Sequence, residues 1–267
     1  MSALDPTRIR EAREGRRLGV PLVYREHTGS TNDDAMALAR QGAEEGTTVL
    51  ADHQTRGRGR LGRRWESPPG RNVYLSVILR PPIPATMAPQ LTLVAGVAVV
   101  ETIRAWLPEA VLKWPNDVLV RGKKVAGVLV EMAARGEQVD FAVVGVGINV
   151  NMASEDFPTE LRHRAGSMAE ALGRPIDRTE VVITLLQKLE EEYEAYLQHG
   201  FEWVRTQWWD RAGMAGQRVS VDTGLRRLEG EAVGLDERGA LQVRVGEEIV
   251  AIVAGDVTIH GSGAACS

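Results

Sequence analysis

The first segment whose side chains could do chemistry is a run of arginine and glycine at residues 54–65. It holds five arginines within nine residues and reads Gln54-Thr55-Arg56-Gly57-Arg58-Gly59-Arg60-Leu61-Gly62-Arg63-Arg64-Trp65. Guanidinium groups pair bidentately with phosphate and carboxylate, and glycine lets the backbone approach a ligand closely. We therefore interpret the run as a mobile loop that binds a triphosphate and a carboxylate. A nucleic-acid patch and a merely solvated basic loop remain as alternatives.

Three glycines of this run, Gly57, Gly59 and Gly62, match the spacing G-x-G-x-x-G of dinucleotide-binding sites. In such sites the motif opens a helix, and an acidic residue follows about twenty positions later. Here Ser67-Pro68-Pro69-Gly70 comes almost at once, and the acidic residue is missing. The sequence also has no G-x-x-x-x-G-K-[ST] phosphate loop. Neither kind of nucleotide site is predicted.

Two segments with lysine and one with asparagine follow. They are Lys113-Trp114-Pro115-Asn116-Asp117, Lys123 to Glu131, and Gly145 to Asn151. The first presents a cation, an amide and a carboxylate at one sheet end, although an ordinary hairpin turn explains Asn116 and Asp117 as well. Glycines inside the other two strands permit close approach of a ligand, and the Asn149 amide can donate and accept hydrogen bonds. Taken singly, Lys124 is typical of a solvated lysine.

A fifth segment, Ser30-Thr31-Asn32, begins a predicted helix, and helix capping alone accounts for it. The histidines are scattered along the chain at His27, His53, His163, His199 and His260. They lack metal-ligand spacing, and neither G-x-S-x-G nor H-E-x-x-H occurs. The sequence therefore supports no metal held by the protein and no serine hydrolase.

These segments need a sheet to bring them together, and the residue patterning predicts one over residues 21–210. We expect strands at 22–25, 47–51, 73–79, 111–113, 118–120, 125–131 and 141–149, and helices at 30–40, 90–107, 167–173 and 179–199. Short polar turns between the later strands imply hairpins and hence a mixed or antiparallel sheet.

A short lead of twenty residues and a small β module lie on either side of this α/β body. In the module, residues 211–262, we expect strands at 218–221, 229–233, 241–245 and 248–253. About fifty residues of this kind suit a small barrel. We therefore predict two domains, 1–212 and 213–267.

Composition excludes several classes of protein. The chain has 267 residues, of which 43% are hydrophobic, so it can bury a large core. Its formal net charge of −4 has the wrong sign for a protein that coats nucleic acid. The most apolar stretch, Leu91 to Val100, is shorter than the roughly 18 residues of a membrane helix. No signal core opens the chain and its single cysteine is Cys266, so we expect a cytoplasmic protein without membrane attachment.

Together, and in this order, the five segments resemble the biotin–protein ligase family, also called biotin–acetyl-CoA-carboxylase ligases. The matching residues are Gly29 to Asn32, Gln54 to Trp65, Lys113 to Asp117, Lys124 to Gly127 and Gly147 to Asn149, which span most of residues 21–150. The Arg-Gly loop followed by Lys-Trp-Pro-Asn-Asp is specific in combination. The resemblance implies an α+β fold: a mixed, class II synthetase-like catalytic sheet packed with helices, then a small SH3-like barrel.

The resemblance also implies what the protein acts on. Its substrates would be biotin and ATP with Mg²⁺, and its partner a biotin carboxyl carrier protein, to which biotin passes through biotinyl-AMP. Some family members carry an N-terminal winged helix and repress genes, but about twenty residues before the first strand are too few for it, so we expect no specific DNA binding. A homodimer stays open. The rival enzyme is a lipoate or octanoyl ligase, which lacks these motifs, and the rival of another class is a nucleic-acid-binding regulator.

Carried onto this sequence, the resemblance assigns roles to single residues. The biotin site would consist of Ser30, Thr31, Asn32, Gln54, Arg58, Gly59, Arg60, Lys124 and Gly127. The ATP site would consist of Arg58, Arg60, Arg63, Trp65, Asn116 and Asn149. Lys124 would lie beside the biotin carboxylate and the α-phosphate, with Lys113 and Arg58 also catalytic. Asp117 is our candidate for orienting or deprotonating the incoming lysine.

Overall fold

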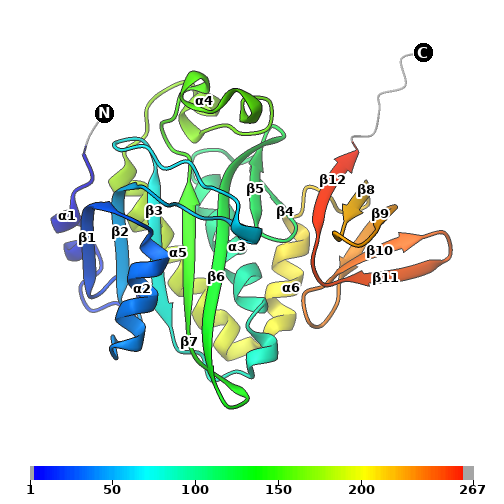
Figure 1. Ribbon diagram of the computed structural model, residues 1–267, viewed down its shortest axis with the longest axis horizontal. Helices are drawn as coiled ribbons and strands as arrows, with labels where there is room; N and C mark the ends of the chain where they lie inside the picture. Colours follow the sequence, from blue (N-terminus) through cyan, green and yellow to red (C-terminus); the bar gives the residue numbers. More distant parts are fainter. Residues whose placement is uncertain (1–2, 261–267) are drawn as a thin grey trace.

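The computed structural model describes residues 3–260 (Figure 1). The larger part of the fold is built on a seven-stranded mixed sheet. The strands are β1 (Leu22–Thr28), β2 (Thr48–Gln54), β3 (Val73–Leu79), β4 (Val111–Lys113), β5 (Asp117–Val120), β6 (Lys123–Arg135) and β7 (Gln138–Ile148). Their order is β1-β2-β3-β7-β6-β5-β4, with β1 and β2 parallel and the other pairs antiparallel. The predicted mixed sheet with hairpins is confirmed.

Helices cover both faces of this sheet. They are α1 (Pro6–Ala12), α2 (Thr31–Arg40), α3 (Gln90–Arg104), α4 (Met168–Leu172), α5 (Arg178–His199) and α6 (Phe201–Asp210), with 3-10 turns η1 (Arg60–Gly62), η2 (Ala85–Met87), η3 (Ser154–Asp156) and η4 (Thr159–Leu161). In Figure 1, α2 lies in front of the sheet, and α3 and α5 lie behind it.

Strand alternation explains the two cores, because successive side chains of a strand point to opposite faces. Val143 of β7 packs with Ala35 and Ala39 of α2 in a small cluster. Its neighbour Val144 belongs to the main cluster, which includes the buried face of α3. Burial on all sides explains why α3 is almost fully apolar and why β3 is apolar apart from Ser76 and the Tyr74 hydroxyl.

Three elements were not predicted: α1, α6 and a strand at Asp256–His260. Asp5 is the N-cap residue of α1, and its side chain accepts hydrogen bonds from the backbone N–H groups of Thr7 and Arg8. Helix α5 stops at Gly200, which has a φ of 74°, and α6 begins directly after it. Because we took that glycine as the end of the helical segment, the second helix was missed.

A second sheet follows α6 and is entirely antiparallel. Its strands are β8 (Arg218–Asp222), β9 (Arg227–Leu235), β10 (Leu241–Val245), β11 (Glu248–Ile252) and β12 (Asp256–His260), in the order β11-β10-β9-β8-β12. It is fastened to the first sheet by Trp114, whose buried indole Nε1 donates to the Gly239 carbonyl at 3.0 Å. Strand β12 faces the arginine- and glycine-rich loop of residues 56–65, called the basic loop from here on.

One helical stretch among residues 3–260, Ala85–Arg104, has the length and mean hydropathy (1.4) of a membrane span. This differs from our expectation that no stretch is long enough. Its most apolar window is 72% buried inside the fold, as in a core helix. The segment passes the test for a membrane span by length and composition only.

Candidate active site

A cavity of about 570 Å³ lies between the end of β2, the strands β4 to β7, the basic loop and β12. All of the side chains and glycines that the sequence singled out as site residues line it. They are Ser30, Thr31, Asn32, Gln54, Arg58, Gly59, Arg60, Arg63, Trp65, Lys113, Asn116, Asp117, Lys124, Gly127 and Asn149. The fold therefore brings the five segments of the sequence to one place.

One end of the cavity presents neutral polar groups. Thr31 donates to Gln54 Oε1 from its backbone N–H at 2.8 Å and from its hydroxyl at 3.1 Å, and Gln54 Nε2 donates to Ser67 Oγ at 3.1 Å. Parallel pairing of β1 and β2 delivers Gln54 beside the start of α2. Ser30 is the N-cap residue of α2, but its side chain makes no capping hydrogen bond, so helix capping alone does not account for this segment.

Asn32 is buried at the same end and held on both sides of its amide. Ser76 Oγ lies 2.6 Å from Asn32 Oδ1, and Asn32 Nδ2 donates to Glu131 Oε2 at 2.9 Å. The amide rests against Gly145, where an added Cβ would lie 2.0 Å from Oδ1. A glycine in β7 is thus required for Asn32 to reach its position.

The basic loop turns back on itself over the cavity. The Gly59 N–H donates to the Arg63 carbonyl at 2.7 Å, and the Trp65 N–H donates to the Gly57 carbonyl at 2.9 Å. Leu61 and Gly62 at the tip have φ values of 57° and 71°, in the left-handed region. Leu61 is 77% exposed there.

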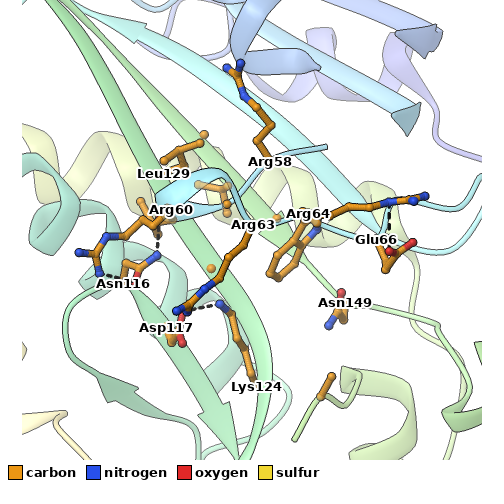
Figure 2. Close-up of a pocket in the computed structure, with 18 of the residues that line it drawn as sticks. Arg58, Arg60, Arg63, Arg64, Glu66, Asn116, Asp117, Lys124, Leu129 and Asn149 are labelled. Atoms are coloured by element: carbon orange, nitrogen blue, oxygen red, sulfur yellow. Dashed lines mark hydrogen bonds and ion pairs between the residues drawn. The ribbon is translucent and has the colours of Figure 1, made fainter. Parts of the chain in front are cut away.

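The arginines of the loop point in different directions (Figure 2). Arg58 points away from the lysine end and pairs with Asp33 at 2.6 Å and Glu131 at 3.1 Å. Arg63 pairs with Asp256 of β12, with Nη1 and Oδ1 3.0 Å apart. Its hydrogen bonds hold the pKa of the Asp256 carboxyl below the ordinary value. The loop is therefore tied to both sheets through carboxylates.

The opposite end of the cavity is cationic. Lys113 and Asp117 are paired residues of β4 and β5, and Lys124 Nζ lies 2.5 Å from Asp117 Oδ1. Burial lowers the pKa of Lys113, although Asp117 acts in the other direction. Arg60 reaches this end as well, with Nη1 3.4 Å from Asn116 Oδ1. A carboxylate or phosphate placed here would meet several cations.

Trp65 forms the wall between the two ends. Its indole packs against β7 so closely that a Cβ at Gly147 would lie 2.6 Å from Nε1, and a Cβ at Gly127 would lie 3.3 Å from Cζ3. Lys124 Nζ lies 5.3 Å from the ring centroid, within the range of a cation–π contact. Within residues 3–260 the buried Nε1 has no hydrogen-bond acceptor.

Two of the predicted ATP-site amides already have backbone partners. Asn149 Nδ2 donates to the Gly166 carbonyl at 3.1 Å, and Asn116 Nδ2 donates to the Val128 carbonyl at 2.8 Å. Both side chains brace the segments around the cavity. Each amide oxygen accepts one long hydrogen bond of 3.4 Å, from Arg60 Nη1 to Asn116 Oδ1 and from Asn72 Nδ2 to Asn149 Oδ1, which leaves a second lone pair for a ligand.

Sequence reasoning missed three residues that shape this site: Ser76, Glu131 and Asp256. Ser76 is the one small polar residue in the otherwise apolar and aromatic run of β3, which was a usable signal. Glu131 lies at the expected end of a strand, and Asp256 lies in the strand that we did not predict. Their partners are distant in sequence, so no local pattern revealed them.

Comparison with known proteins finds matches to two family models along the chain. A family model described as the biotin/lipoate A/B protein ligase family matches residues 24–149, and one described as the biotin protein ligase C terminal domain matches residues 215–259. A bifunctional ligase/repressor of Bacillus spizizenii is 40% identical over 257 residues, covering 96% of this chain and 79% of the relative. A biotin–[acetyl-CoA-carboxylase] ligase of Mycobacterium tuberculosis is 36% identical, covering 86% of this chain and 85% of the relative.

The fold has close counterparts among solved structures. The biotin protein ligase from Aquifex aeolicus in complex with biotin and ATP superposes with a TM-score of 0.76 and 32% identity, covering 90% of this chain and 98% of that one. The apo structure of the same enzyme gives 0.73 and 28% identity over the same shares of the two chains.

Proposed function

The chain belongs to the biotin–protein ligase family, and from that premise we propose how its own residues join biotin to AMP and then to a carrier lysine. The protein is a biotin–[carrier protein] ligase that uses ATP. The assignment of each step to a residue is the proposal.

One observation supports the assignment most: the cavity is neutral and polar at one end and cationic at the other. Biotin has the same two-ended chemistry, with a neutral ureido group that donates and accepts hydrogen bonds and a carboxylate at the end of an apolar chain. The ureido head would lie against Ser30, Thr31, Asn32 and Gln54. The carboxylate would then reach Lys124, with Gly127 leaving room beside it.

In the first step a biotin carboxylate oxygen attacks the α-phosphorus of ATP, and pyrophosphate leaves with the electrons of the broken P–O bond. Negative groups must approach one another, so the barrier is electrostatic. Lys113 and Lys124 would offset this charge, and the Asp117 contact holds the Lys124 ammonium in place. Arg60, in the loop, would mainly retain the biotinyl-AMP that forms. Arg58 and Arg63 would close the loop over biotin and ATP by exchanging a carboxylate for a phosphate.

In the second step a carrier lysine attacks the carbonyl of biotinyl-AMP, and AMP leaves. A free lysine has a pKa of about 10.4, so its amine must lose a proton first. Asp117 lies at the cationic end, where it would orient that amine or accept its proton directly or through water. The loop 56–65 keeps water from the mixed anhydride in the meantime. Trp65, Asn116 and Asn149 would hold the nucleotide.

The described residues do not supply a set of protein ligands that could coordinate Mg²⁺ on their own. Residues 3–260 contain no group of three or more His, Cys, Asp or Glu side chains that could hold a metal ion, and Asp117 is engaged by Lys124. We propose that Mg²⁺ enters on the phosphate oxygens of ATP, which is a common arrangement for this ion.

For the rest of the molecule we propose a domain boundary between residues 212 and 213 and an SH3-like barrel in the second domain. The five-stranded antiparallel sheet β8 to β12 and the C-terminal family match support the barrel. The partner would be a biotin carboxyl carrier protein in the cytoplasm. We propose no sequence-specific DNA binding.

The test is formation of the acyl-adenylate. The protein is mixed with ATP, Mg²⁺ and either biotin or lipoate, and the acyl-AMP is separated by chromatography. We expect biotinyl-AMP and no lipoyl-AMP. Lipoyl-AMP as the main product would overturn the assignment of the neutral end to a ureido group.

A further inference from the structure

Two histidines lie side by side outside the cavity just described. His27 on β1 and His53 on β2 are partners in the register of the parallel pair, at the left edge of the sheet in Figure 1. Partners in neighbouring strands point to the same face of a sheet. The two Nδ1 atoms are 3.2 Å apart, and the rings are perpendicular, with an interplanar angle of 88°.

This spacing fits a single metal ion between the two rings. Because imidazole nitrogens bind Zn²⁺ at about 2.0–2.1 Å, two nitrogens 3.2 Å apart can share one ion at a ligand–metal–ligand angle of about 100°. That angle lies between the right angle of octahedral or square-planar sites and the tetrahedral angle. Imidazole suits Zn²⁺, Ni²⁺ and Cu²⁺, with Cu²⁺ bound most tightly of the three.

We propose that His27 and His53 chelate one divalent transition-metal ion at this edge of the sheet, with water completing its coordination. His27 is exposed and His53 half-buried, so an ion from solvent can reach them. The residues that the structure describes contain no larger group of metal-ligating side chains. The two imidazoles are therefore the protein's whole share of this site.

A metal ion bound here would steady the residues at the neutral end of the cavity, although the ion itself would lie outside the cavity. His53 precedes Gln54, which accepts the hydrogen bonds of Thr31, and His27 precedes Thr28, whose hydroxyl donates to Asp34 of α2 at 2.7 Å. A bound ion would fasten the ends of β1 and β2 to one another. Neither imidazole lines the cavity, so metal binding is separable from the proposed ligase chemistry.

The measurement is calorimetric titration with NiCl₂ or CuCl₂. The protein carries no histidine tag, and Cys266→Ser is used as the background to remove the single thiol. Each of His27→Gln and His53→Gln should weaken binding of one equivalent of metal at least tenfold. The matched control is His163→Gln, an exposed histidine elsewhere, which should leave the affinity unchanged.

A second readout identifies the ligands directly. In the Cu²⁺-loaded protein, electron paramagnetic resonance should show two coordinated nitrogens, and His53→Gln should reduce them to one or none. Circular dichroism of each variant checks that the fold is retained. Absence of binding to the background protein, or equal affinity in the His27→Gln variant and its background, would leave the His27–His53 contact as a simple hydrogen bond and overturn the site.

Discussion

Gly147→Ala should weaken the use of ATP because it displaces Trp65. The added Cβ would lie 2.6 Å from indole Nε1 and Cε2, whereas packed carbon atoms keep about 3.5–4.0 Å, so the ring must retreat by about 1 Å. Alanine would not strain the backbone at this position, since Gly147 does not have a positive φ.

Overpacking of this kind costs about 1–3 kcal/mol. If the cost falls on the ligand-bound site, the KM for ATP should rise by about 5- to 150-fold, at 1.4 kcal/mol for each factor of ten. The KM for ATP is measured from the rate of pyrophosphate release at saturating biotin. The denaturant midpoint, measured in parallel, separates a change at the site from a loss of overall stability.

A double-mutant cycle decides whether Trp65 is the cause. Trp65→Ala alone should also raise the KM for ATP, but it removes the ring that the new Cβ would strike. Gly147→Ala should therefore add little in the Trp65→Ala background. If Gly147→Ala has the same effect in both backgrounds, the clash with the indole is not the reason, and the close packing of Trp65 does not matter for ATP.

Four further outcomes follow from the site. Lys124→Ala should slow single-turnover pyrophosphate release by about 10² or more, a typical cost for one charge-stabilising donor, and a normal rate would refute its role. Arg60→Ala should still make biotinyl-AMP but release it, so that a bystander protein becomes biotinylated; labelling of the carrier alone would contradict this. Because burial lowers the pKa of Lys113, its charge is lost at lower pH than that of an ordinary lysine, so the adenylation rate should fall as pH rises through that pKa. Lys113→Arg, which stays protonated, should extend the rate to higher pH, and an unchanged profile would exclude Lys113. Amide hydrogen exchange in residues 56–65 should slow when biotin or biotinyl-AMP binds, and equal exchange would remove the lid from the mechanism.

The sequence was informative where function needs unusual local residues. Arginine and glycine in the basic loop have no role in a core, so their presence pointed to a ligand, and the loop does line the cavity. Hydrophobic alternation likewise predicted the central strands, because one buried face forces a period of two. The end of α5 before Gly200 was predicted correctly, but α6, which begins directly after that glycine, was missed.

The rest depended on contacts between residues far apart in the chain. The Arg63–Asp256 pair joins the loop to a strand of the other sheet, and the Asn32–Glu131 bond crosses from α2 to β6. His27 and His53 showed no metal-ligand spacing in sequence, yet the register of two parallel strands places their rings in contact. Register and sheet order, which a local pattern does not contain, decided all three.

Transfer of biotin to a carrier protein is the most direct test of the central claim. The purified chain is incubated with ATP, Mg²⁺, a biotin carrier domain, and biotin or lipoate in separate reactions, and the carrier is probed with streptavidin and by intact mass. The account predicts one added biotin per carrier, dependent on ATP and on the acceptor lysine, and no lipoylation. Transfer of lipoate without transfer of biotin would contradict it.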